Sequence, residues 1–258
     1  MDVVPVFKED VDGIPVLWRP PDPSTDQGTL VIWLAGFSGT KEDCAPQLRA
    51  LAAQGFTALS FDAWQHGERR IEPEEELRAR VRSNIRRWFW PILYRTARDT
   101  VAVLDWSEYR LGLRGAVGIG GVSMGGDIAV TAAGLDRRLA AVSAVIATPD
   151  WLRPGSCEPP GVPDAKAWRA YRDGNPLSYL DRYAHRPALA FECGDEDRQV
   201  PPDGAERFCA ALAATYRDYP DCLRIARHAG VGHRFADAMW SAAMDWFDRH
   251  LNGADGAA

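Results

Sequence analysis

The sequence predicts an α/β fold with a mostly parallel central sheet of about eight strands, helices on both faces, and a small cap or rim. Strand-like and helix-like segments alternate along most of the 258 residues, a pattern that favours parallel strands joined by helices. The central strand-like segments are continuous apolar runs, as in strands buried on both faces. No repeat, low-complexity linker or composition shift divides the chain, so one domain over residues 1–258 is expected.

In the first half of the chain, three strand-like runs and one helix precede a long helical stretch. The expected elements are strands at Ile14–Arg19, Thr29–Ala35 and Phe56–Ala63, a helix at Cys44–Gln54, and a mostly helical stretch at Glu72–Arg110. The helix places Leu48 and Leu51 on one face, and Gly55 ends it. Pro91 is expected to interrupt the long stretch, because a proline removes a helix hydrogen bond.

The second half continues the alternation. The expected strands are Ala116–Gly120, Ala140–Ala147, Pro187–Cys193 and Cys222–His228, and the expected helices are Gly126–Gly134 and Phe235–Leu251. A further helix is expected to open at Val200-Pro201, because proline suits a first helical turn. Two insertions, near 68–94 and 151–186, are expected to shape the cap or rim, since loops at the carboxyl ends of parallel strands bind ligands.

Between an apolar strand and a helix of small residues lies Gly121-Val122-Ser123-Met124-Gly125. This matches G-x-S-x-G, the nucleophile elbow, in which a sharp strand-to-helix turn exposes a serine hydroxyl. Side chains at the two glycines would clash with the neighbouring strand or helix. The motif predicts Ser123 as a nucleophile.

A serine hydroxyl needs a base, and the base needs an orienting acid. In elbow proteins the chain order is serine, acid, histidine. His233 lies in a glycine-containing loop between the last strand and the last helix, where an imidazole can reach the serine; His228, at the end of that strand, is the alternative base. Asp197 follows a strand in a G-x-x-D-x-x-V-P arrangement, and Asp150 is the alternative acid.

Acyl transfer from a serine also requires two backbone N–H groups aimed at the developing oxyanion. Met124 follows the serine at a helix N-terminus, whose dipole favours negative charge. The loop 36–39, after the Thr29–Ala35 strand, should supply the second N–H, with Phe37 the preferred donor.

Composition limits the other function classes. The net charge of −6 gives no basis for nucleic-acid binding. The five cysteines are scattered without metal-ligand spacing, so no metal site is expected and a reducing cytoplasm fits best. The amino terminus lacks the regions of a signal peptide, and no apolar run is long enough to span a membrane. No cofactor is expected, and a homodimer stays open.

These motifs resemble those of the α/β-hydrolases. The resemblance runs from residue 29 to 251 and is carried by the segments 36–42, 62–69, 121–126, 194–197 and 232–233. The most similar subgroup is that of small bacterial esterases related to dienelactone hydrolase and the prolyl-oligopeptidase catalytic domain. The resemblance implies the same triad and oxyanion donors. The chain departs from the subgroup at Ala35, usually a histidine, and at Ser123, a cysteine in dienelactone hydrolases proper.

Aromatic residues near the expected mouth of the site form a candidate substrate pocket: Trp64, His66 and Trp151. For His66 a structural role in its own turn is the favoured alternative. Five arginines crowd one helical stretch: Arg78, Arg80, Arg82, Arg86 and Arg87. A phosphate or coenzyme A grip is one interpretation of these arginines, and a salt-bridged surface with Glu74–Arg78 and Glu76–Arg80 pairs is the favoured one.

The sequence therefore predicts a serine hydrolase that acts on a small-molecule ester or related acyl substrate through an acyl-enzyme. A thioesterase, a peptidase and an acyl-transfer or cyclisation enzyme are alternatives on the same scaffold. A prolyl-oligopeptidase-type peptidase is disfavoured because the chain has no room for the propeller that such enzymes carry. A non-catalytic receptor is also disfavoured, because all three triad positions are filled.

Overall fold

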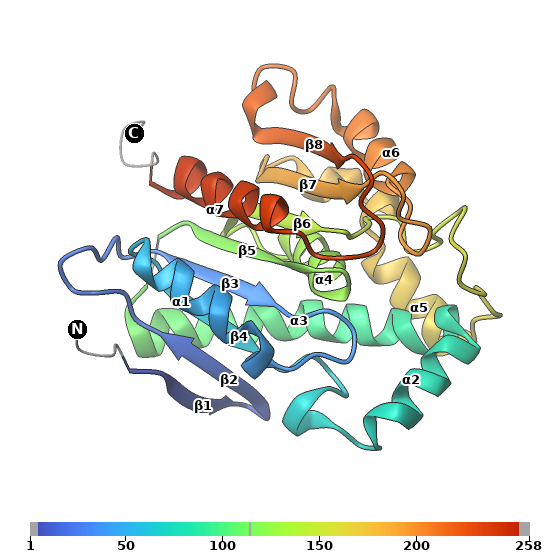
Figure 1. Cartoon of the computed structure of the whole chain (residues 1–258), viewed down its shortest axis with the longest axis horizontal. Helices are drawn as coiled ribbons and strands as arrows, with labels where there is room; N and C mark the ends of the chain where they lie inside the picture. The colour runs from blue at the N-terminus through green and yellow to red at the C-terminus, as the bar shows by residue number, and fades with distance from the viewer. Residues whose placement is uncertain (1–4, 114, 253–258) are drawn as a thin grey trace.

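The computed structural model describes residues 5–113 and 115–252. Its eight strands form one sheet in the order β1-β2-β4-β3-β5-β6-β7-β8 (Figure 1). The strands are β1 Phe7–Val11, β2 Ile14–Arg19, β3 Leu30–Leu34, β4 Thr57–Phe61, β5 Val117–Val122, β6 Leu139–Val145, β7 Ala188–Gly194 and β8 Leu223–His228. Pairing is antiparallel between β1 and β2 and between β2 and β4, and parallel elsewhere. The expected mostly parallel α/β sheet is confirmed.

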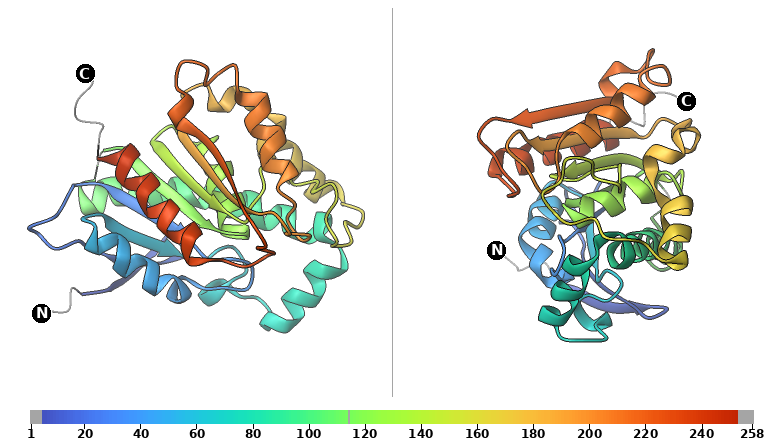
Figure 2. Two further views of the ribbon diagram at one scale, coloured as in Figure 1. Left: turned by 45° about the horizontal axis from the view of Figure 1, so that its top comes forward. Right: turned by 90° about the vertical axis from the view of Figure 1, so that its right-hand side faces the viewer.

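Helices cover both faces of this sheet (Figure 2). They are α1 Ala45–Ala53, α2 Glu74–Ser83, α3 Ile85–Leu111, α4 Met124–Ala133, α5 Ala165–Gly174, α6 Asp203–Leu212 and α7 Asp237–Leu251. The helices α1 and α7 pack on one face and α3, α4, α5 and α6 on the other, each face with its own apolar core. In the described ranges, no helix is both long enough and apolar enough to cross a bilayer.

The edge strand β1 was not expected from the sequence, since its residues Phe7–Val11 are mostly exposed and show no apolar alternation. It pairs with β2 through a two-residue turn in which Asp12 and Gly13 have φ values of 52° and 80°. Both values lie in the left-handed region that a type I′ hairpin requires. Asp-Gly is the sequence signal for such a turn.

The expected interruption at Pro91 is wrong, because α3 runs through that proline without a break. The helical stretch divides earlier, at Asn84, whose side chain accepts a hydrogen bond from the Arg87 N–H at 3.0 Å. This contact is an N-cap, which begins a new helix. Trp90 and Ile92 on either side of the proline are buried, so tertiary packing outweighs the lost backbone bond.

Both sequence insertions lie at the carboxyl ends of the parallel strands, on the right of Figure 1. The first forms α2 and the start of α3, and the second forms an irregular segment, α5 and two short 3-10 turns. Both therefore border the edge of the sheet where the candidate site is found. The expectation of no signal peptide concerns the amino terminus, and residues 1–4 there lie outside the described residues.

Candidate active site

The turn between β5 and α4 has the geometry of a nucleophile elbow. Ser123 has φ 53° and ψ −114°, a strained conformation for a residue with a side chain. A Cβ on Gly121 or Gly125 would lie 2.6 Å or 2.3 Å from the Leu34 carbonyl oxygen. Only glycine permits this approach of the turn to β3, and the approach holds the serine at the end of its strand.

The three side chains expected to form a triad lie in one hydrogen-bonded line. The distance from His233 Nε2 to Ser123 Oγ is 3.0 Å, and that from His233 Nδ1 to Asp197 Oδ2 is 2.7 Å. The Asp197 carboxylate only accepts hydrogen bonds, so Nδ1 carries the imidazole proton and Nε2 accepts from the serine hydroxyl. The other oxygen of Asp197 accepts from the N–H groups of Gln199 and Val200 at 2.9 and 2.8 Å. These bonds fix the carboxylate, which is buried.

The loops that carry the acid and the base are bound to each other. Glu196 N–H donates to the Val231 carbonyl at 3.0 Å, and Gly230 N–H donates to Asp195 Oδ1 at 2.8 Å. Gly194 lies beneath this junction, where a Cβ would be 2.3 Å from the Val231 oxygen. The glycine of the G-x-x-D segment thus allows the two loops to meet, and the cross-links keep the acid and base in register.

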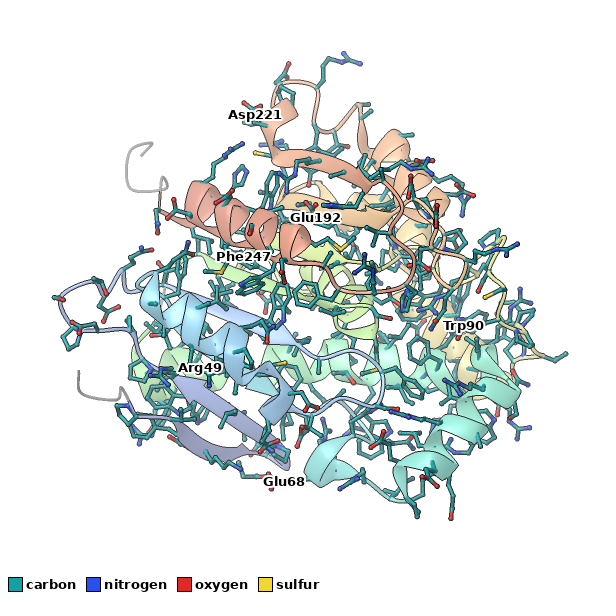
Figure 3. All side chains as sticks on the ribbon, in the orientation of Figure 1. Arg49, Glu68, Trp90, Glu192, Asp221 and Phe247 are labelled. Atoms are coloured by element: carbon teal, nitrogen blue, oxygen red, sulfur yellow. The ribbon has the colours of Figure 1, made fainter. Side chains whose placement is uncertain are left out.

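The alternative base and acid have other partners. His228 Nε2 lies 2.7 Å from Glu192 Oε2, between β8 and the neighbouring strand β7; Glu192 is labelled there in Figure 3. The Asp150 carboxylate accepts from Arg207 at 2.7 Å and from Leu152 N–H at 3.1 Å. Both side chains are therefore engaged in structural contacts away from the serine.

The loop after β3 approaches the elbow as expected for an oxyanion hole. A Cβ on Gly36 would lie 3.9 Å from Ser123 Cβ, so this backbone passes directly beside the serine. Over the described part of the chain, neither Phe37 N–H nor Met124 N–H donates a hydrogen bond to the protein. Two free N–H groups beside a serine can bind an oxyanion.

A buried ionic cluster anchors this loop from behind. The fully buried Asp62 carboxylate accepts from Lys41 N–H, Lys41 Nζ and Glu68 N–H, each at 2.9 Å. Lys41 Nζ also binds the Glu68 carboxylate, which reaches the surface at the lower edge of the molecule (Figure 3). Burial disfavours the Lys41 ammonium, yet its hydrogen bonds to Glu68 and Asp62 outweigh burial and raise its pKa. Gly67, at φ 55°, is required because a Cβ there would overlap Asp62.

The expectation that Trp64, His66 and Trp151 form the pocket is wrong for the cavity at the serine, which none of them lines, although Trp151 lines a neighbouring hollow. Trp64 faces Arg69 and Arg95, whose guanidinium groups lie over its ring at 5.2 and 4.8 Å. Trp151 is buried in the core, where its carbonyl accepts from the Trp90 indole at 2.9 Å. Aromatic content alone could not separate core packing from substrate contact.

His66 is also buried, and its Nδ1 lies 3.0 Å from the Trp64 carbonyl oxygen. This contact agrees with the alternative that His66 has a structural role in its own turn. Its ring lies edge-on to Phe37 at 5.4 Å between centroids, so it supports the oxyanion loop from the side. Burial lowers the pKa of His66 and favours the neutral ring.

A small cavity of about 50 Å³ opens beside Ser123. Its lining combines apolar residues with charged and polar ones: Phe37, Val81, Ile85 and Phe89, with Arg82, Arg153, Glu158 and Gln199. The insertions therefore supply most of the wall, as expected for segments at this edge of the sheet. The volume suits a short acyl or alcohol group.

Beneath the cavity lies a buried ion pair that the sequence interpretation missed. Asp127, one turn after the serine, binds Arg153 Nη2 at 2.6 Å and Thr148 N–H at 2.7 Å. Burial raises the pKa of the Asp127 carboxyl, and the contacts with Arg153 and Thr148 oppose that rise. Arg153 also binds Glu158 at 3.3 Å and lies over the Phe89 ring. A single carboxylate in a helix of small apolar residues was the available signal.

Comparisons with known proteins show which proteins this chain is similar to. A model of the prolyl oligopeptidase family matches residues 94–254. The "Putative esterase YitV" of Bacillus subtilis (strain 168) is 24% identical over 264 residues, covering 96% of this chain and all of the relative. The crystal structure of TT1662 from Thermus thermophilus matches with a TM-score of 0.77 and 25% identity over 96% of this chain and 99% of that one.

A structure titled as a "Putative Dienelactone Hydrolase", from Klebsiella pneumoniae, has a TM-score of 0.70 and 15% identity over 98% and 100% of the two chains. At that identity the match shows the fold alone. With the family match it confirms the expected resemblance to α/β-hydrolases of the dienelactone hydrolase and prolyl-oligopeptidase subgroup. For the residues that the structure describes, no group of three or more potential metal ligands is found.

Proposed function

Because the chain belongs to the prolyl oligopeptidase family and is a serine hydrolase, we propose that it cleaves a carboxylic ester of a small molecule through a Ser-His-Asp triad. The observation that carries the proposal is the line Ser123–His233–Asp197, with contacts of 3.0 and 2.7 Å. Those distances lie within the reach required of a nucleophile, base and orienting acid.

The reaction proceeds in two steps. Ser123 Oγ attacks the ester carbonyl while His233 Nε2 takes the hydroxyl proton, and Asp197 stabilises the resulting imidazolium. The N–H groups of Phe37 and Met124 hold the oxyanion of the tetrahedral intermediate, each contributing about 3 kcal/mol to the transition state. His233 then returns the proton to the leaving alcohol. Water, activated by the same imidazole, hydrolyses the acyl-enzyme and releases the acid.

Two observations favour an ester over the peptide substrate in the family's name. The relative matched over its whole length is named an esterase. The cavity directly beside Ser123 is about 50 Å³, a volume that suits a short acyl or alcohol group. Substrate class depends on the site rather than on the fold, so the size of the cavity carries this part of the proposal.

Labelling with a fluorophosphonate probe tests the proposal directly. We expect the wild-type protein to be labelled, the Ser123→Ala variant to lose labelling completely, and a remote Ser24→Ala control to behave as wild type. Asp197→Asn should keep the fold and reduce kcat for a p-nitrophenyl ester by about 10⁴-fold, because the imidazole would adopt the wrong tautomer. Full labelling of Ser123→Ala, or a wild-type rate in Asp197→Asn, would contradict the triad.

A series of p-nitrophenyl esters of increasing acyl length tests the substrate class. We expect the highest kcat/KM for short acyl groups and a decline once the chain exceeds the cavity. Peptide p-nitroanilides provide the comparison for peptidase activity. Turnover of the anilides at rates equal to those of the best ester would replace the ester proposal with the peptidase alternative.

A further inference from the structure

Two arginines at the junction of α2 and α3 differ from their neighbours because they have no carboxylate partner. Four nearby arginines pair with acids, through the contacts Arg78–Glu74, Arg80–Glu72, Arg87–Asp164 and Arg95–Asp99. For the described residues, no carboxylate lies within 4.0 Å of the guanidinium groups of Arg82 or Arg86. Arg82 lines the cavity at Ser123, and Arg86 lines a second hollow.

Arg86 borders a second hollow of about 170 Å³ between the start of α3 and the segment 151–160. Within 5–113 and 115–252, the Nε atom of Arg86 is buried and has no hydrogen-bond partner. The Nε1 atom of Trp151, another residue of this lining, is also buried without a partner, and the Trp151 residue is only 1% exposed. Guanidinium and indole nitrogens only donate hydrogen bonds. An acceptor supplied by a ligand would satisfy them, because buried unpaired donors are costly.

The second hollow adjoins the cavity at Ser123, since both are lined by Ile85, Arg153 and Glu158. Arg153 is not the free cation of this region, because Asp127 and Glu158 hold its guanidinium at 2.6 and 3.3 Å. Glu158, which lines both hollows, shares this guanidinium with Asp127, so a single cation faces two carboxylates. The positive charge available to a ligand in the second hollow therefore comes from Arg86.

We propose that the second hollow is a subsite for a carboxylate on the substrate, so that the enzyme prefers esters with an anionic group over neutral esters of the same shape. This inference rests on the proposed function and adds the substrate class. The small apolar cavity would hold the short chain next to the scissile carbonyl, and Arg86 would bind the carboxylate beyond it. The guanidinium matches a carboxylate because its N–H groups can form two parallel hydrogen bonds.

Two matched ester pairs test the preference. On the acyl side they are the p-nitrophenyl monoester of adipic acid and its terminal amide; on the alcohol side, meta-carboxyphenyl acetate and meta-carbamoylphenyl acetate. We expect wild-type kcat/KM to favour the acid over the amide by about 10- to 100-fold in one pair, the range expected for a charged hydrogen bond. The pair that shows the preference identifies the side of the ester that enters the hollow.

Variants locate the preference. Arg86→Gln should abolish the preference by lowering kcat/KM for the acid at least about tenfold more than kcat/KM for the amide, because only the acid forms an ion pair with the guanidinium. Arg87→Gln is the matched control, since Arg87 is the next residue on the same helix, is half exposed and pairs with Asp164; it should keep the preference. A preference that survives Arg86→Gln but disappears in Arg82→Gln would place the anion in the first cavity and overturn the proposal.

Calorimetric titration of the Ser123→Ala protein with monomethyl adipate and with its terminal amide, which carries no carboxylate, measures binding without turnover. We expect the acid to bind at least about tenfold more tightly, and Arg86→Gln to remove the difference. Equal binding of the two compounds, together with no ester preference, would overturn the subsite. Failure of fluorophosphonate labelling would instead contradict the triad, so the two failures are distinguishable.

Discussion

The two walls of the candidate site use charge in opposite ways. On the wall that carries the oxyanion loop, the segments 36–44 and 62–69, the buried charges bind each other: Lys41 with Asp62 and Glu68, and Arg69 with Asp99 at 2.7 Å. On the opposite wall, formed by the α2–α3 junction and the segment 151–160, Arg82 and Arg86 have no acid within 4.0 Å among the described residues. We call these the paired wall and the open wall.

The difference separates positioning from recognition. Charges that satisfy one another in a buried cluster fix the backbone between them, and an oxyanion hole requires fixed N–H groups. Charges left unsatisfied at a cavity cost stability in the empty protein and are useful only when a ligand completes them. Removal of a buried charge should therefore impair folding on the paired wall, whereas removal of Arg86 from the open wall should impair substrate choice alone.

The largest expected effect comes from the centre of the paired wall. Asp62→Ala removes three hydrogen bonds from a fully buried carboxylate and leaves the Lys41 ammonium buried with only Glu68 and Glu42. Breaking a buried ion pair from one side costs about 3–5 kcal/mol. We expect the free energy of unfolding, measured by urea denaturation, to fall by this amount, with a reduced kcat because the Phe37 N–H is no longer fixed.

Glu206→Ala is the surface control, since it breaks an ion pair with Arg227 in which both side chains are exposed. Its cost should stay below about 1 kcal/mol, as should that of Arg86→Gln. If Asp62→Ala were no more destabilising than these two variants, the distinction between the walls would fail.

An intermediate effect is expected from Asp127, which joins the nucleophile helix α4 to the open wall through Arg153. Asp127→Asn retains one carbonyl oxygen for two donors, Thr148 N–H and Arg153 Nη2, so one buried donor loses its partner. The free energy of unfolding should fall by about 1–3 kcal/mol. Glu158→Gln, which changes the outer partner of the same arginine, should cost under about 1 kcal/mol. If Glu158→Gln lowered the free energy of unfolding more than Asp127→Asn did, Arg153 would depend mainly on Glu158.

The framework of the site could be predicted from the sequence because local chemistry dictates it. Continuous apolar runs predict the buried strands β3 to β7, and the order of elbow serine, acid and histidine identifies Ser123, Asp197 and His233. The structure brings these three side chains together. Their selection needed only the knowledge that parallel strands present their carboxyl ends at one edge.

The walls could not be predicted, because they depend on distances between segments far apart in the chain. Helical spacing pairs Arg80 with Glu76, but its partner in the structure is Glu72, while the expected Glu74–Arg78 pair forms. The expectation that these arginines form a salt-bridged surface is wrong for Arg86. This residue instead lines a hollow together with residues of the segment 151–160. Likewise, nothing local to Trp64 indicates that its ring faces arginines away from the cavity.

The smallest expected effect concerns His66, which carries the one buried side-chain polar atom of the paired wall that has no partner among the described residues. Its Nε2 is buried with no partner, and burial lowers its pKa below the ordinary 6.5. The unfolded chain therefore takes up a proton at this residue before the folded protein does, so its contribution to stability is complete above about pH 6.5 and decreases as the pH falls. At about pH 6 the loss is at most about 1 kcal/mol.

His66→Asn isolates this contribution, because an asparagine amide can donate to the Trp64 carbonyl as the ring does but does not titrate. We expect the free energy of unfolding of the wild type to fall more than that of the variant between about pH 8 and about pH 6, whatever their difference at the upper pH. The comparison of slopes cancels the packing change at the site. If the free energies of unfolding of the wild type and the variant changed in parallel with pH, the protonated imidazole would have a partner in the folded protein. His66 would then not be an unsatisfied side chain of the paired wall.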